Sequence, residues 1–279
     1  MSWDFLSEDE TKFMRTIMSD LEGMPWAQQI LAEMDTNNRP WKMADKAAFF
    51  ELRFAYALHQ SGIAPSYEID GEGHSKIDFG FHFEGQCWKV ELMRLEETLA
   101  VMNATHSWTE EDGTQWSKML LASQHDSIPQ SEEGETLKAV QRICQKMERN
   151  GRPHKFSIPT YALHVLLVDF RTFLMNGGDI HDQIHVAFGG NYVDSLYRRY
   201  WNNNLISGVF SEHTVVNGAV EARDRLHFIG FVTERSYESD IFGQATRFFA
   251  NPNLLHHEGA HEAIKKWPLT GSCLMTAQV

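Results

Sequence analysis

One stretch of the chain, residues 75–95, alternates apolar and polar residues in the way that predicts two β-strands. In the first strand every second residue is apolar, namely Ile77, Phe79, Phe81 and Phe83. The residues between them are Lys76, Asp78, Gly80 and His82. The second strand alternates in the same way, with Trp88, Val90 and Leu92 between Cys87, Lys89, Glu91 and Met93. Because successive side chains of a strand point to opposite faces, each strand has an apolar face and a polar face.

The turn between the two strands sets which residues lie opposite each other. A two-residue turn at Glu84-Gly85 places Phe83 opposite Gln86, and Asp78 then lies directly across from Glu91. Directly opposed residues have Cβ atoms about 4.5–5.5 Å apart. Two carboxylates that close repel each other, so they need a cation between them or a raised pKa on one of them. The alternatives are an ordinary solvated hairpin face, or a register shifted by one residue that separates the acids.

The pattern along the rest of the chain alternates between helices and strands. Helical periodicity predicts helices over 5–22, 24–34, 45–61 and 134–149, within 179–204, and after Asn251-Pro252-Asn253. Ser7 and Glu10 form a capping box at the start of the first helix. Residues 66–70 predict a short strand, and the apolar runs 160–170 and 226–233 predict strands buried on both faces. Glu51 lies at the edge of the apolar stripe of helix 45–61, where it either pairs with a cation or points toward the acidic face of the hairpin.

Composition limits the class of protein without naming a function. The chain has 279 residues, of which 42% are hydrophobic and 23% charged, and these are values of a globular protein. No apolar run is long enough for a membrane span, and the acidic first residues do not form a signal peptide. Cys87, Cys144 and Cys273 are far apart, which favours reduced thiols and a cytoplasmic location. The net charge of −13 argues against a surface that coats nucleic acid broadly, although a local basic patch can coexist with it.

The order of these features resembles the restriction-endonuclease-like, PD-(D/E)XK nuclease superfamily. A helix carries Glu51, the strand KIDFGF carries Asp78, the strand WKVELMR carries Glu91, and a buried strand follows the next helix. The resemblance covers residues 45–170 and implies an α/β fold with a central mixed β-sheet flanked by helices. We expect residues 1–44 to form an N-terminal helical layer. Residues 45–279 would form a single nuclease-like domain with a polar insertion at about 96–133.

The resemblance also implies a function. Asp78 and Glu91 would hold Mg²⁺ or Mn²⁺, with Glu51 as an outer ligand, for hydrolysis of phosphodiester bonds in DNA. A homodimer would suit the cleavage of both strands of a duplex. The family's catalytic Lys, however, lies two residues after the Glu, and that position is Met93 here. Lys76 or Lys89 could replace it; the alternative is a catalytically inactive nuclease-like protein that serves in binding or assembly.

A second motif points to a different class of enzyme. His257, Glu258 and His261 match HExxH, in which two His one helical turn apart bind Zn²⁺ and the Glu acts as general base. Gly259 weakens this helix, and no His, Asp or Glu follows Glu262 as a third ligand. A zinc metallopeptidase is therefore a lower-ranked alternative, and the other interpretation is a surface helix with solvated His side chains.

Overall fold

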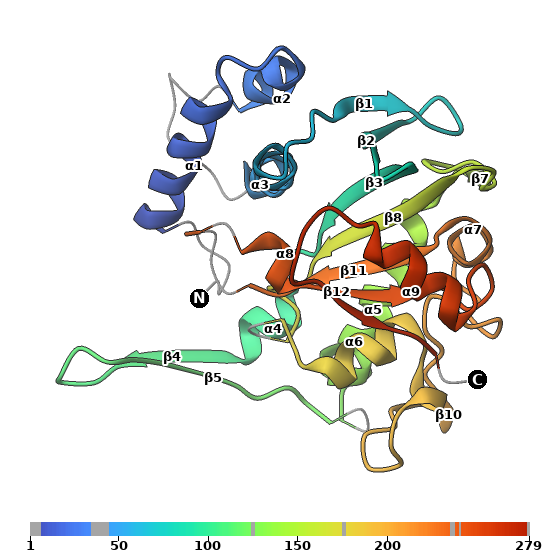
Figure 1. The fold of residues 1–279 in the computed structure, drawn as a ribbon. Coiled ribbons are helices and arrows are strands. Elements are labelled where there is room, and N and C mark those ends of the chain that lie inside the picture. Colours follow the sequence, from blue (N-terminus) through green and yellow to red (C-terminus); the bar gives the residue numbers. More distant parts are fainter. Residues whose placement is uncertain are drawn as a thin grey trace.

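The fold comes from a computed structural model, which describes residues 7–34, 45–123, 126–174, 177–234, 238–239 and 241–277. Within these ranges, seven strands form a mixed sheet in the order β1-β2-β3-β8-β11-β12-β13. Helices cover both faces of the sheet (Figure 1). The protein is an α/β protein with a central mixed sheet flanked by helices, as the sequence predicts.

The strands of the sheet combine an antiparallel half with a parallel centre. They are β1 (Ser66–Asp70), β2 (Lys76–Phe83), β3 (Gln86–Arg94), β8 (Ala162–Asp169), β11 (Phe228–Val232), β12 (Thr246–Ala250) and β13 (Cys273–Met275). Strands β1, β2 and β3 form an antiparallel meander, while β8 runs parallel to both β3 and β11. Strand β12 is antiparallel to β11 and parallel to β13. The parallel centre explains the continuous apolar runs of β8 and β11, because helices cover both of their faces.

The helices form two layers. One face of the sheet packs against α1 (Glu8–Leu21), α2 (Gln28–Glu33), α3 (Lys46–Gln60), α8 (Phe242–Ala245) and α9 (His257–Lys265). The other face packs against α5 (Glu132–Lys146), α6 (Ile180–Ala187) and α7 (Ala219–Arg225). Helix α5 is the crossover between the parallel strands β3 and β8. Short 3-10 turns lie at η1 (Pro25–Ala27), η3 (Ile128–Gln130) and η4 (Gly190–Tyr192).

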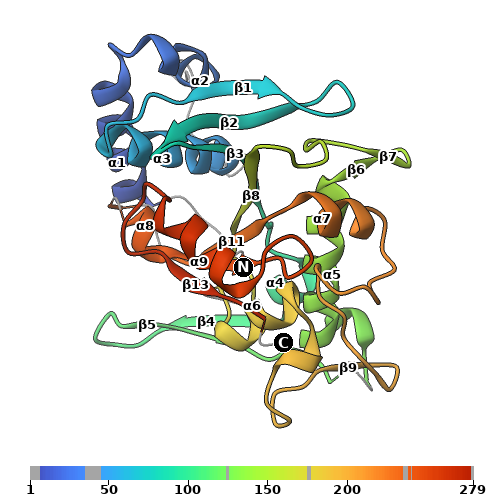
Figure 2. The ribbon, with the colours of Figure 1, turned by 45° about the vertical axis from the view of Figure 1, so that its right-hand side comes forward.

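Three two-stranded ribbons lie outside the main sheet. They are β4 (Thr105–Thr109) with β5 (Gln115–Met119), β6 (Glu148–Arg149) with β7 (Arg152–Pro153), and β9 (Tyr200–Trp201) with β10 (Asn204–Leu205). The β4–β5 ribbon follows helix α4 (Leu99–Ala104) in the segment expected to be an insertion, and it projects from the body as an arm (Figures 1 and 2). Among the described residues, no helix is both long and apolar enough to cross a membrane.

Helix α3 sits at the centre of one core. Its side chain Phe54 is fully buried. The Phe54 ring centroid lies 5.3 Å from that of Phe79 on β2, 5.5 Å from Phe242 and 6.0 Å from Trp267. The N-terminal helices complete this core, because Met14 of α1 is buried in the same cluster. Aromatic contacts thus fix α3, which carries Glu51, against the β2–β3 hairpin.

Several details of the sequence prediction are confirmed. The capping box is present, with Glu10 N donating to Ser7 Oγ at 3.0 Å and Ser7 N donating to Glu10 Oε2 at 2.8 Å. The predicted helix 45–61 and the strands 66–70, 160–170 and 226–233 correspond to α3, β1, β8 and β11. Strands β12 and β13 were missed, because each is short and lacks a clear alternation.

The predicted helix over 179–204 is wrong beyond its first third, because α6 ends at Ala187. Gly189 has φ +90, and a Cβ there would lie 2.7 Å from the backbone N of Gly208. The chain must therefore turn at this glycine, which no other residue could occupy without strain. Arg199 consequently lies outside a helix, where it pairs with Asp182.

The prediction that Ile77 shares one face of β2 with Phe79 and Phe81 is wrong. It is buried in the cluster on the α5 side of the sheet, whereas Phe79 and Phe81 are buried on the α3 side. The positions paired between β2 and β3 run from Phe83–Gln86 to Phe79–Val90. Ile77 precedes this ladder, so the regular alternation of faces along β2 changes at Asp78.

We predict that Phe54→Ala lowers the free energy of unfolding by about 3–5 kcal/mol, since it removes a fully buried aromatic ring. Urea denaturation measures the change. Tyr161→Ala is the matched control, because this aromatic side chain is 73% exposed and its loss should change the free energy of unfolding by less than about 0.5 kcal/mol. Equal destabilisation by the two substitutions would contradict the assigned core.

Candidate functional site

The hairpin register brings Asp78 and Glu91 together as the sequence predicts. Phe83 pairs with Gln86 and Phe79 with Val90, so Asp78 and Glu91 occupy the next opposed positions. Beyond Phe79 and Val90, hydrogen bonds from backbone N–H groups to carboxylates replace the backbone–backbone hydrogen bonds of the two strands. The backbone N–H of Leu92 donates to Asp78 Oδ2 at 2.6 Å, and the backbone N–H of Asp78 donates to Glu91 Oε2 at 3.3 Å. Each carboxylate is thus held against the backbone of the opposite strand.

Glu91 is fully buried and is paired with two lysines. Lys146 Nζ lies 2.8 Å and Lys155 Nζ 2.7 Å from Glu91 Oε1. Removing a carboxylate from water costs several kcal/mol unless charged partners and hydrogen bonds compensate it. The two ammonium groups and the Asp78 N–H supply this compensation.

The two lysines reach Glu91 from parts of the chain far from the hairpin. Lys146 is the last residue of α5, whose inward side chains Val140 and Ile143 pack on the sheet. Lys155 follows β7 and has φ +69. Its backbone is fixed by two hydrogen bonds, from its own N–H to Ser75 Oγ at 3.0 Å and from the N–H of Glu72 to its carbonyl at 2.8 Å.

Neither lysine that the sequence suggested for this role contacts the acids. Lys76 is exposed and pairs with Asp70 at 2.5 Å, because β1 places Asp70 directly opposite it. Lys89 lies opposite Gly80 and beside His164 in the sheet, and it forms no ion pair with the described residues. Met93 is half-buried and packs in the core on the α5 side. The cations that pair with Glu91 therefore come from α5 and from the loop after β7.

Sequence reasoning missed Lys146 and Lys155 although a signal was present for one of them. Lys146 directly precedes Met147, which is buried, so a long side chain at the end of this helix lies next to the core. No local pattern distinguishes Lys155, which owes its place to the contacts of its backbone with Glu72 and Ser75.

Glu51 is the third acid of the site. It projects from α3, and Tyr67 of β1 donates its hydroxyl to Glu51 Oε2 at 2.8 Å. The pKa of Glu51 is raised to about 7, mainly because the carboxyl is buried. The hydrogen bond from Tyr67 lowers this pKa, and the negative charges of Glu33 and Glu91 raise it. The predicted inward orientation of Glu51, toward the hairpin acids, is consistent with this electrostatic contact.

The acids and Lys146 influence one another's protonation. Burial raises the pKa of Asp78 well above its usual range, and the charges of Glu91 and Glu51 add to the effect. Burial alone would lower the pKa of Lys146, but the neighbouring Glu91 reverses this and the pKa is raised. Burial and the neighbouring acids thus favour the protonated form of Asp78, while Glu91 favours the protonated form of Lys146.

The oxygen atoms of the Asp78, Glu91 and Glu51 carboxylates are the kind of ligand that a hard divalent cation prefers. Carboxylate oxygens are the ligands of Mg²⁺, and a cation near Asp78 would favour the ionised carboxylates against burial and the neighbouring negative charges, which raise the pKa values of Asp78 and Glu51. Among the described residues, no group of three or more His, Cys, Asp or Glu side chains is placed so that it could hold a metal ion. Mg²⁺ does not require one, because it commonly keeps several waters and binds through one or two carboxylates.

The HExxH residues lie elsewhere, on α9. His257, Glu258 and His261 are all exposed, and the two His rings have centroids 4.5 Å apart. His257 Nδ1 is 2.8 Å from Thr276 Oγ1. The described part of the chain brings no third ligating side chain to this pair. The structure thus places the two His side by side without completing a zinc site.

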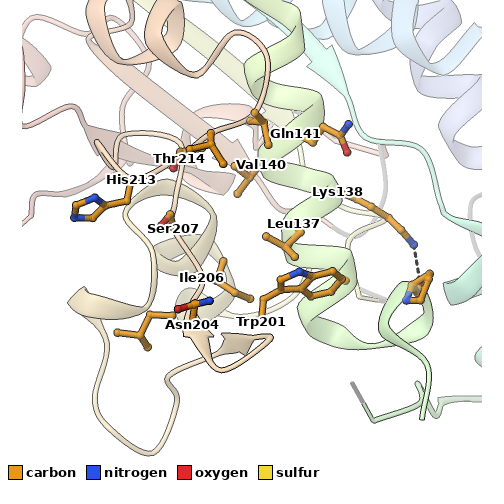
Figure 3. A pocket seen from close by; sticks show the side chains of 15 residues that line it. Leu137, Lys138, Val140, Gln141, Trp201, Asn204, Ile206, Ser207, His213 and Thr214 are labelled. Atoms are coloured by element: carbon orange, nitrogen blue, oxygen red, sulfur yellow. Dashed lines mark hydrogen bonds between the residues drawn. The ribbon is translucent and has the colours of Figure 1, made fainter. Parts of the chain in front are cut away.

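An apolar pocket of about 490 Å³ lies at the other half of α5 (Figure 3). Leu137 and Val140 of α5 face Trp201 and Ile206 across it. None of Asp78, Glu91 and Glu51 lines this pocket, so it is separate from the acidic site.

Comparisons with protein-family models, with curated proteins and with solved structures found no match. The geometry of the acids and lysines is therefore the basis for assigning a function.

We predict that Glu51→Gln stabilises the protein increasingly as pH rises from about 4.5 through about 7. In the wild type, the folded state keeps this proton to a pH of about 7, whereas the unfolded chain loses it near 4.5, so wild-type stability falls across that interval. Gln does not titrate, and the difference in free energy of unfolding should approach about 3 kcal/mol above pH 7.

Urea denaturation of both proteins between pH 4.5 and 8.5, without divalent ions, measures this difference. The exposed Glu258→Gln is the control and should show no such trend. A pH-independent difference for Glu51→Gln would show that Glu51 ionises as it does in the unfolded chain.

Proposed function

We propose that the protein is a Mg²⁺- or Mn²⁺-dependent nuclease that hydrolyses phosphodiester bonds in DNA. One observation carries the proposal: Asp78 and Glu91 lie on adjacent strands just beyond their last paired positions, each bound to the backbone of the other strand, with the ammonium groups of Lys146 and Lys155 on Glu91. Acids for a metal and cations for a phosphate are the two components that metal-dependent phosphodiester hydrolysis needs.

The order of elements supports the proposed relationship to the restriction-endonuclease-like superfamily. Helix α3 with Glu51 precedes the meander β1–β3 with Asp78 and Glu91, and α5 then leads to the parallel strand β8. This is the order on which the resemblance of the sequence rests. The proposed difference is that the catalytic cation comes from α5 instead of from β3.

Each side chain of the site has a defined part in this proposal. Asp78 and Glu91 would hold the metal, with Glu51 as an outer ligand oriented by the Tyr67 hydroxyl. The metal would lower the pKa of a bound water and offset charge on the phosphate. Lys146, kept protonated by Glu91, can bind a non-bridging phosphate oxygen and stabilise the negative charge that develops as the P–O bond breaks.

One observation favours the alternative, a catalytically inactive protein for binding or assembly. Both carboxylate oxygens of Glu91 already have partners, since Oε1 pairs with the two lysines and Oε2 accepts from the Asp78 N–H. Glu91 would then be a structural anchor and would bind no metal. Metal binding distinguishes the two functions.

We predict that Mg²⁺ or Mn²⁺ binds the wild type and that Asp78→Asn abolishes binding, because the substitution removes one negative charge from the ligand set. Isothermal titration calorimetry measures both. A parallel Zn²⁺ titration uses His257→Ala with His261→Ala to test the HExxH pair. Absence of Mg²⁺ and Mn²⁺ binding to the wild type would favour the inactive protein, and Zn²⁺ binding that depends on the two His would favour the metallopeptidase.

We predict that Lys146→Met lowers the rate of Mg²⁺-dependent DNA cleavage about 10²–10³-fold, the usual effect of removing a group that stabilises developing charge. Lys89→Met should have a much smaller effect, because Lys89 does not pair with Glu91. Single-turnover cleavage of a labelled duplex measures the rates, and Lys118→Met on the exposed β5 strand is the control. A greater loss in Lys89→Met than in Lys146→Met would return the role to Lys89.

A further inference from the structure

A basic cleft of about 740 Å³ adjoins the acidic site. Two segments line it, residues 73–76 before and at the start of β2, and residues 149–155 around the β6–β7 ribbon. Four of its ten lining residues are Lys or Arg and none is Asp or Glu; the four are Lys76, Arg149, Arg152 and Lys155. The whole chain, in contrast, has 25 Lys and Arg against 38 Asp and Glu. So local an excess of positive charge on an acidic protein indicates an anionic ligand.

The two walls of the cleft are joined through their backbones. The Glu72 N–H donates to the Lys155 carbonyl at 2.8 Å, and the Lys155 N–H donates to Ser75 Oγ at 3.0 Å. Gly73 has φ +65, and a Cβ there would lie 2.8 Å from the Pro153 carbonyl oxygen. This close approach requires glycine, and it holds the cleft in one shape before any ligand binds.

The two arginines of the β6–β7 ribbon are available to a ligand. Arg149 and Arg152 are directly paired across the ribbon, both are exposed, and neither forms an ion pair with the described residues. The tight turn at Asn150 and Gly151, which have φ +55 and +73, brings the two guanidinium groups to the end of the ribbon. Guanidinium groups are well suited to phosphate, since they can donate two parallel hydrogen bonds.

Lys155 connects the cleft to the acidic site. It lines the cleft, and its Nζ lies 2.7 Å from Glu91 Oε1 and donates to the Lys76 carbonyl at 2.6 Å. A phosphate backbone bound along the cleft would therefore pass next to Lys155, the residue that is paired with the buried Glu91. No aromatic residue other than His lines the cleft, so it lacks the stacking surface that binds unpaired bases. The lining residues are instead suited to contacts with phosphate groups.

We propose that this cleft binds the phosphate backbone of duplex DNA, with Arg149 and Arg152 as its principal contacts, and directs the backbone toward Asp78 and Glu91. The choice of DNA rests on the nuclease function proposed above. Arg149 and Arg152 are binding residues here and take no part in bond cleavage.

The test measures binding separately from cleavage. Fluorescence anisotropy of a labelled duplex in EDTA gives the dissociation constant and its dependence on salt for the full-length protein. We expect Arg149→Ala with Arg152→Ala to weaken binding about tenfold or more and to reduce the slope of log K against log salt by about 2. The control is Lys12→Ala with Arg15→Ala, which removes two positive charges from α1 on the opposite side of the molecule (Figures 1 and 2).

Several results would overturn the proposal. One is that the wild type does not bind the duplex at low salt, and another is that the control pair weakens duplex binding as much as the Arg149 and Arg152 pair does. A third is that polyglutamate displaces the labelled duplex as well as unlabelled duplex does, which would indicate an acidic polypeptide as the ligand. Tighter binding of a single strand would also contradict it.

The outcome for the cleft is distinguishable from the outcome for the nuclease. If the protein cleaves DNA with Mg²⁺ but the double substitution of Arg149 and Arg152 does not weaken duplex binding, the cleft proposal is wrong and the nuclease proposal stands. Binding that requires both arginines, without cleavage under any divalent ion, would end the nuclease and leave the cleft.

Discussion

The ion pairs of Glu91 join β3 to two parts of the protein that are distant from it in the sequence, helix α5 and the loop after β7. A fully buried carboxylate is tolerated only when charged partners replace its water, and here these partners are Lys146 of α5 and Lys155 of the loop after β7. The crossover helix and the β6–β7 ribbon are therefore tied to β3. Loss of either lysine would leave a buried negative charge less compensated, so the acidic site and the local fold depend on the same interaction.

The same constraint shapes the protonation of the site. Both lysines pair with Glu91, while the pKa values of Asp78 and Glu51 are raised, chiefly by burial and further by the charges of neighbouring acids. A site in this state gains stability from one further positive charge. A divalent cation and a bound phosphate then have complementary effects, since the cation offsets the acids while the phosphate pairs with the lysines.

Local periodicity explains how much of the fold and the site could be predicted from the sequence. Alternation with period two predicted the two strands of the hairpin, and the two-residue turn at Glu84-Gly85 predicted the pairing that is observed from Phe83–Gln86 to Phe79–Val90. Lys146 and Lys155 could not be predicted, because their contact with Glu91 depends on how α5 and the β7 loop pack on the sheet. Lys76 failed as a candidate for a similar reason, since the neighbouring strand β1 supplies Asp70 as a closer partner.

The protein is acidic as a whole but has one cleft lined by Lys and Arg, and this distribution of charge could orient an anionic substrate. With a net charge of −13, most of the surface repels a polyanion, and this repulsion favours binding where basic residues concentrate. The cleft lined by Arg149 and Arg152 is such a place, and Lys155 belongs both to it and to the Glu91 pair. A phosphate backbone held there would reach the acids from one direction. The negative surface would then contribute to selectivity, because it restricts a nucleic acid to the orientation in which a phosphate meets Lys146 and Lys155.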